Sequence, residues 1–152
     1  MQKTGAILSK LAWAQNRRDE IPNIELAEEI VATEDREAIA ILVKNLSSKA
    51  PIRRDCIKTL YEIGDRKPEF IEGHLERFLD LLNSKNNRMQ WGATEAISCI
   101  SRHSPKAVYS HLPVILRAAE KGSVITRDHA VKTLVNIGTQ TGHREEIFQM
   151  LH

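Results

Sequence analysis

The sequence is poor in aromatic residues and in cysteine, and both shortages narrow the class of protein. Aromatic residues make up 5% of the 152 residues, while leucine, isoleucine and alanine dominate the apolar set, which favours helices over sheets. The two cysteines, Cys56 and Cys99, stand far apart without a CxxC spacing. We therefore expect neither a disulfide framework nor a zinc knuckle, and we interpret both as small apolar residues in a reducing compartment.

The chain also lacks a long apolar run and a large excess of charge. No stretch approaches the ~18 apolar residues that a transmembrane helix needs. Lys10 interrupts the apolar N-terminal stretch, so we expect no signal peptide, no membrane contact and a cytoplasmic location. The 22 basic and 20 acidic residues leave a net charge of +2, whereas a protein that coats nucleic acid usually carries a larger excess. Any basic patch must therefore be local.

Sequence motifs for catalysis are missing as well. The chain contains no GxxxxGK[ST], GxGxxG, GxSxG or HExxH pattern. Among the carboxylates within residues 25–37, Glu34, Asp35 and Glu37 are explained by the preference of negative side chains for the first turn of a helix, and no cleft is indicated for an acidic catalytic pair. We therefore expect a protein that is not an enzyme, with no catalytic residues, no cofactor and no metal site.

What the sequence does contain is an internal repeat. The phrase IKTLYEIG at 57–64 returns as VKTLVNIG at 131–138, and TEAISCIS at 94–101 lies halfway, 37 residues from each. Three columns of the repeat are apolar, namely Cys56, Ala93 and Ala130, then Leu60, Ile97 and Leu134, then Ile63, Ile100 and Ile137. Their spacing is that of an amphipathic helix. A small residue, Gly64, Ser101 or Gly138, closes each copy and is interpreted as a helix terminator.

The segments between these copies also repeat, so the unit is a helix pair. KPEFIEGHLERFLDLL at 67–82 aligns with SPKAVYSHLPVILRAA at 104–119, and a fainter copy, RRDEIPNIELA, begins at residue 17. The pattern predicts helices near 4–16, 22–32, 34–47, 52–65, 68–83, 88–102, 105–120 and 125–139. Pro113 predicts a kink or a break near His111. No linker divides the chain, so residues 1–152 are expected to form one domain.

Two helices per period of about 37 residues are typical of an α-solenoid. RRDCIKTLYEIG and TRDHAVKTLVNIG resemble the second helix of the HEAT repeat family. The resemblance covers roughly residues 4–140 and implies an all-α, right-handed superhelix of about four HEAT-like pairs. In that family an aspartate near the loop between paired helices often links neighbouring units, and Asp19 and Asp55 fit this position, whereas Gly92 and His129 do not.

Arginines recur where the second helix of each pair begins, and they are the candidate binding residues. The set comprises Arg17, Arg18, Arg53, Arg54, Arg88 and Arg127, with Trp91 in the column of Arg54. The HEAT resemblance implies that second helices line a concave face, so these residues would form a ladder there. Guanidinium groups hold carboxylates or phosphates through paired hydrogen bonds. The same arginines suit a structural ladder with the aspartates equally well, and Trp91 is equally well a buried packing residue.

The leading hypothesis is a non-enzymatic scaffold that binds an acidic or helical segment of a protein partner on this arginine-lined face. The alternative is nucleic-acid binding through the arginine column, as in HEAT-like DNA-repair modules, which would weaken steeply with salt. A third functional class is that of enzyme accessory proteins, as in the HEAT-type lyases that attach bilins, but no motif in this sequence supports it. An apolar stripe of Ile147, Phe148, Met150 and Leu151 is expected either to fold back on the last pair or to form a dimer.

Overall fold

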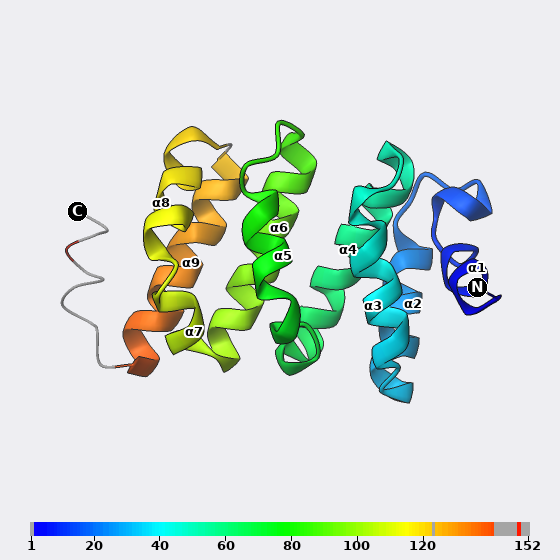
Figure 1. The fold of residues 1–152 in the computed structure, drawn as a ribbon, viewed down its shortest axis with the longest axis horizontal. Coiled ribbons are helices and arrows are strands. Elements are labelled where there is room, and N and C mark those ends of the chain that lie inside the picture. The colour runs from blue at the N-terminus through cyan, green and yellow to red at the C-terminus, as the bar shows by residue number, and fades with distance from the viewer. Residues whose placement is uncertain (1, 123, 142–148, 150–152) are drawn as a thin grey trace. The chain divides into compact units, whose positions relative to one another are not determined.

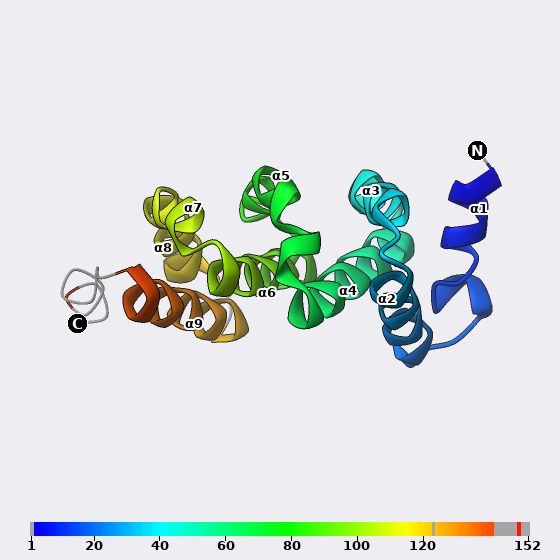
Figure 2. The same ribbon diagram turned by 90° about the horizontal axis from the view of Figure 1, so that it is seen from below.

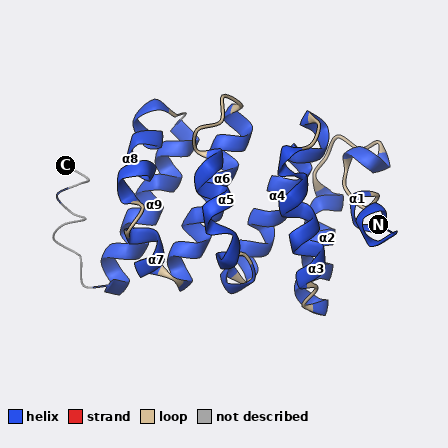
Figure 3. Ribbon diagram, viewed as in Figure 1, coloured by secondary structure: helices blue, strands red, loops and turns tan. Residues whose placement is uncertain are grey.

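A computed structural model of the chain describes residues 2–122, 124–141 and 149, and these residues form helices joined by short turns (Figure 1). No strand occurs among them (Figure 3), so the predicted all-α class is confirmed. The chain divides into two compact units, Met1–Ile71 (unit 1) and Glu72–His152 (unit 2). No helix in the described part of the chain has the length and apolar character to cross a membrane.

In unit 1, residues 2–71 form four α-helices. They are α1 (Gln2–Leu8), α2 (Ile21–Thr33), α3 (Arg36–Lys44) and α4 (Ala50–Arg66), with short 3-10 turns at Trp13–Gln15, Asn45–Ser47 and Pro68–Phe70. Helices α2 and α4 pack together, and α3 covers one side of them while α1 packs on α3 (Figure 2). The Asp35 carboxylate caps α3 by accepting a hydrogen bond from the Ala38 N–H at 3.1 Å.

The described residues of unit 2 form five α-helices. They are α5 (Leu75–Leu81), α6 (Asn87–His103), α7 (Pro105–Tyr109), α8 (Leu112–Lys121) and α9 (Val124–Thr141), preceded by a 3-10 turn at Glu72–His74. Figure 2 shows α5, α7 and α8 on one side of a layer formed by α6 and α9. The longest helices of the chain, α4, α6 and α9, carry the three copies of the repeat.

The apolar columns of the repeat are the core of both units. Leu60 and Ile97 are 0% exposed and Leu134 is 2% exposed, and the other two columns are buried to the same degree. The small residues that close each copy do not end the helices, because Gly64, Ser101 and Gly138 lie inside α4, α6 and α9. That prediction was wrong because these positions are buried, where a small side chain permits close packing.

Several helix boundaries agree with the sequence, and three segments differ. The helices expected at 22–32, 52–65, 88–102 and 125–139 each end within two residues of the observed bounds. The break before Pro113 is confirmed, since α7 ends at Tyr109 and α8 begins at Leu112. The α-helix expected at 34–47 ends at Lys44 and continues as a 3-10 turn.

The other two differences are interruptions. The helix expected at 4–16 stops at Leu8, and the one expected at 68–83 becomes two 3-10 turns before α5. The first break arises because the Ala12 N–H donates to the Asn23 side chain of α2 at 2.9 Å. Tertiary hydrogen bonding of this kind competes directly with the helix. The C-terminal stripe of Ile147, Phe148, Met150 and Leu151 lies outside the described residues.

Candidate partner-binding site

A pocket in unit 1 brings together three of the predicted arginines. It has a volume of roughly 500 Å³ and is lined by Ala12, Trp13, Asn16, Arg17, Arg18, Glu20, Arg54 and Asp55. Arg17 and Arg18 come from the turn before α2, and Arg54 comes from the second turn of α4. The indole of Trp13 is 52% exposed, so the pocket combines guanidinium groups with a large aromatic surface. This combination is typical of protein-binding sites.

The turn that carries Arg17 and Arg18 has a defined backbone. Asn16 adopts a left-handed conformation with φ of 57°, and its N–H donates to the Trp13 carbonyl at 3.0 Å. The Arg17 N–H donates to the Ala12 carbonyl at 2.9 Å. Asparagine tolerates the left-handed region better than most residues. The indole and the two guanidinium groups therefore project from a turn that its own hydrogen bonds close.

A buried carboxylate ties this turn to the rest of the unit. Asp55 is 2% exposed and accepts hydrogen bonds from the Trp13 N–H at 2.8 Å and from the Asn23 side chain at 3.0 Å. The Asn23 side chain, itself 0% exposed, accepts a hydrogen bond from the Ala12 N–H. Asp55 therefore joins α4 to the turn and to α2, which is a structural role. Burial, with the nearby Asp55 charge, raises the pKa of Cys56 to about 12, so this thiol stays protonated and unreactive.

Asp19, which occupies the same sequence column one repeat earlier, behaves differently. It is exposed and pairs with Arg17 of the same turn through two hydrogen bonds, of 2.9 and 3.0 Å. The hydrogen bond from Arg17 is the main cause that lowers the pKa of Asp19. Arg18 and Arg54 make no hydrogen bond or ion pair to the described residues. The pocket thus contains one guanidinium group that is already paired and two that are unpaired.

Arg53 does not join this group. Its side chain is half-buried and does not line the pocket, and its Nε atom makes no hydrogen bond within the described ranges. The adjacent position, Arg54, is exposed. Neighbouring residues on a helix point about 100° apart, and Arg54 lines the pocket whereas Arg53 does not. The sequence pattern alone did not distinguish them.

In unit 2, Arg88 and Trp91 form a second cluster. The Arg88 guanidinium lies 3.9 Å from the centre of the Trp91 ring, and the indole also stacks on His129 of α9, with ring centres 6.4 Å apart. The His129 Nδ1 atom lies 2.5 Å from the Glu95 carboxylate. Trp91 is therefore packed between a cation and an imidazole, and it is half-buried rather than an exposed anchor.

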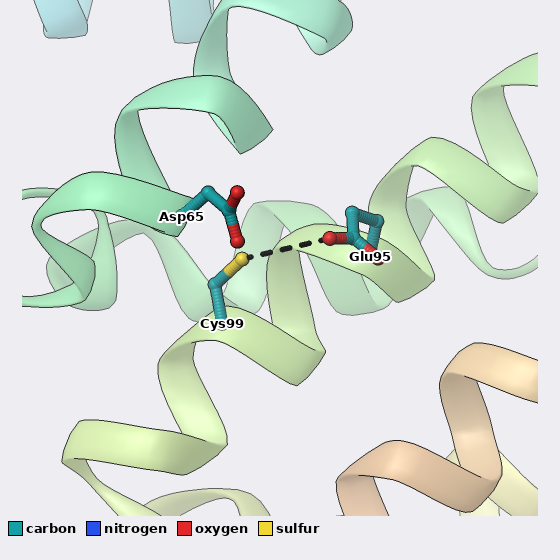
Figure 4. Close-up of side chains that lie close together, drawn as sticks. All are labelled: Asp65, Glu95 and Cys99. Atoms are coloured by element: carbon teal, nitrogen blue, oxygen red, sulfur yellow. Dashed lines mark hydrogen bonds between the residues drawn. The ribbon is translucent and has the colours of Figure 1, made fainter.

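The Glu95 carboxylate is the charged centre of this cluster. Its burial alone would raise its pKa, but the hydrogen bond and charge of His129, with Lys132 and Arg102, outweigh burial, so the pKa is lowered. Figure 4 shows the Glu95 side chain beside the Cys99 thiol, which donates to it at 3.9 Å from one helical turn further along α6. The contact between Glu95 of α6 and His129 of α9 joins these two helices.

The cap of α6 positions Arg88 and Trp91, and its loss should be measurable. The Asn86 side chain accepts a hydrogen bond from the Met89 N–H at 3.2 Å. We expect Asn86→Ala to lower the free energy of unfolding by about 1 kcal/mol, as at other N-caps. Urea denaturation measures this. Asn86→Asp keeps the acceptor and should retain the stability; a loss as large as that of the alanine variant would show that the cap is not the cause.

Arg127 lies apart from both clusters. Its Nε atom donates to the Ala119 carbonyl at 3.2 Å, and its side chain lines an apolar groove between α8 and α9. The predicted set therefore separates into a unit 1 pocket, a Trp91 cluster and single residues. Trp13 was missed because it stands outside the repeating columns; its place four residues before Arg17 was the only signal.

Comparisons with known proteins bear on the fold alone. No protein-family model and no curated protein matches the sequence. The crystal structure of an engineered protein is similar, with a TM-score of 0.60 and 21% sequence identity over 91% of this chain. The chain spans 63% of that protein's length. The similarity supports the all-helical architecture.

Proposed function

We propose that the protein is a non-enzymatic interaction module that binds an acidic segment of a protein partner at the unit 1 pocket. The observation that carries the proposal is the meeting of Arg18 and Arg54, both unpaired, with the exposed indole of Trp13 around one cavity. Guanidinium groups hold carboxylates through paired hydrogen bonds, and tryptophan supplies apolar contact area at little entropic cost. The preferred ligand is therefore an acidic side chain next to an apolar or aromatic one.

The fold proposed to carry this pocket is a right-handed α-solenoid of about four HEAT-like helix pairs. Its support is the repeat of about 37 residues, whose three apolar columns are buried in α4, α6 and α9 alike. The buried Asp55, which links α4 to the preceding pair, occupies the position at which HEAT-like units are joined. Arrays of this kind offer extended surfaces for partners and seldom enclose a catalytic site. A cytoplasmic location is proposed with it.

Nucleic-acid binding is less favoured at this pocket, although arginine also binds phosphate. Glu20 and Asp55 stand in the same lining as the three arginines. A nucleic acid carries a negative phosphate at every nucleotide, so these two carboxylates would repel its backbone. The two ligand classes are separated by experiment.

The test is the binding of labelled probes to the wild type and to Arg18→Glu/Arg54→Glu. The probes are a short peptide of glutamates around one phenylalanine, a DNA duplex and a DNA single strand, each followed by fluorescence anisotropy at low and moderate salt. We expect the peptide to bind and the charge reversal to weaken it at least about tenfold, as charged residues at interface centres do. Trp13→Ala should weaken the peptide without changing its salt dependence.

The matched control is Lys49→Glu/Lys67→Glu, which makes the same change of charge at two exposed positions of unit 1 outside the pocket. It should change the peptide affinity by less than about twofold, because exposed distant charges are screened. DNA binding that falls steeply with salt and is lost in Arg18→Glu/Arg54→Glu would replace the proposal by its nucleic-acid alternative. Equal loss in both variants, or no binding of any probe, would remove this pocket as the site.

A further inference from the structure

Helix α9 exposes an apolar stripe on the side that faces away from the core. Val124, Val131 and Val135 are 69%, 45% and 46% exposed and follow one another at helical spacing on one face. Ile125 beside them is 44% exposed. On the opposite side of the helix, Thr133 and Ile137 are 0% exposed. A contiguous exposed apolar stripe of this kind marks an interaction surface.

In the preceding copy of the repeat, the equivalent face belongs to α6. Val131 and Val135 occupy the columns of Thr94 and Ser98 in α6. Those two residues are 1% and 5% exposed, and α9 packs on α6, with the Asn136 side chain donating to the Ser98 carbonyl at 3.3 Å. This face of α6 is therefore a helix-packing face. The same face of α9 is more apolar than that of α6 and yet exposed.

Charged residues on this side of α9 suggest which helix would cover it. Asp128 and Lys132 lie one turn apart, are exposed, and form no ion pair with the residues that the structure describes. They are placed symmetrically about residue 130. Two antiparallel copies of α9 that cross at residue 130 would place each Asp128 beside the Lys132 of the other copy. One crossing would thus bury two valine stripes and form two ion pairs.

We propose that the outer face of α9 is a self-association surface on which a second copy of this chain packs its own α9 in antiparallel orientation. The contact is isologous, because the same residues face each other across a two-fold axis, which is the commonest symmetry of protein dimers. It uses Val124, Val131, Val135, Asp128 and Lys132. It is independent of the unit 1 pocket and of the partner proposed there.

The first test is sedimentation velocity of the full chain from about 1 to about 200 μM. We expect the wild type to form dimers in this range and Val131→Asp/Val135→Asp to weaken dimerisation at least tenfold, with circular dichroism unchanged. Ile21→Asp is the matched control, because Ile21 is an exposed apolar residue of α2, 49% exposed, and should leave the dimer intact. A wild type that is monomeric at the highest concentration overturns the proposal, as does an equally tight dimer of the double variant.

A charge exchange tests the antiparallel register. Asp128→Lys and Lys132→Asp each set two pairs of like charges against each other, so each variant should dimerise about tenfold more weakly. The double variant Asp128→Lys/Lys132→Asp restores both pairs in the opposite sense and should dimerise like the wild type. Loss of dimers in both single variants without recovery in the double variant overturns the α9-to-α9 pairing. These exposed residues lie outside the core, so folding of the variants is not at risk.

Discussion

Asp55→Ala is expected to lower the free energy of unfolding by about 3 kcal/mol, because two hydrogen bonds to a charged acceptor are lost and their donors are left unpaired in the core. The carboxylate is 2% exposed and accepts from the Trp13 N–H and the Asn23 side chain. Water cannot replace it without opening the contact between α4 and the preceding turn. The measurement is urea denaturation followed by circular dichroism, with the midpoint and slope compared between variants.

The preceding copy of the repeat provides the control for this prediction. Asp19→Ala removes the carboxylate that occupies the same column of the preceding copy but is exposed. Its midpoint should fall much less than that of Asp55→Ala, because the exposed ion pair with Arg17 contributes little and the Ile21 N–H that also donates to Asp19 can turn to water. Asp55→Asn keeps one acceptor oxygen and should fall between the wild type and the alanine variant. If Asp55→Ala and Asp19→Ala were equally stable, the buried carboxylate would have no linking role, and the proposed HEAT-like junction would lose its physical support.

Glu95→Gln is expected to lower the free energy of unfolding by about 2 kcal/mol near neutral pH, because a largely buried carboxylate loses its charge while its partner imidazole stays in place. Both side chains are mostly buried, at 17% exposed for Glu95 and 14% for His129, with 2.5 Å between their nearest atoms. Since Trp91 stacks on His129, loss of the Glu95 charge should also change the environment of the indole. Chemical denaturation and tryptophan fluorescence report the two effects.

The pH dependence of this pair has a defined sign. The pKa of Glu95 is lowered from the ordinary 4.5, so its ionised form is bound more strongly in the folded state than in the unfolded chain. Its contribution is fully present above pH 4.5 and is lost as the pH falls through the lower folded value. The difference in stability between the wild type and Glu95→Gln should therefore shrink as the pH falls below 4.5.

An exposed pair of the same type provides the comparison. His111 lies 3.6 Å from Glu76, whose side chain is 82% exposed. Glu76→Gln should leave both the midpoint of denaturation and its pH dependence unchanged, because solvent screens the pair. A pH-independent difference for Glu95→Gln would mean that the substitution acts through packing and that the ion pair does not stabilise the contact of α6 with α9.

The helices could be predicted from the sequence because their pattern is local. Leu60, Ile97 and Leu134 recur at 37 residues within the same helical stripe, and burial of all three follows from their apolar character. The break before Pro113 was also predictable, because proline lacks the N–H that would continue the helix. The interruption after Leu8 was not, because it depends on a hydrogen bond between Ala12 and Asn23.

The candidate site was predictable only in part. Recurrence in the sequence identified Arg17, Arg18 and Arg54, but it treated Arg53 as their equal and selected Trp91 without considering Trp13. The structure corrects both choices. Arg53 is half-buried and does not line the pocket, whereas Trp13 is exposed and does. A repeating column states which residues are equivalent along the chain; it does not state which neighbours cover them.

The sequence by itself determined an all-helical protein, the repeat of about 37 residues, the buried columns and the breaking effect of its prolines. Each of these depends on residues within a few turns of one another, where side-chain volume, hydrophobicity and backbone geometry decide the outcome. Only the tertiary structure decided that Asp55 is buried and Asp19 exposed, that Glu95 meets His129, and that α9 leaves its valines uncovered. Those facts depend on contacts between distant segments, because the environment of a polar or apolar side chain is set by whatever packs against it.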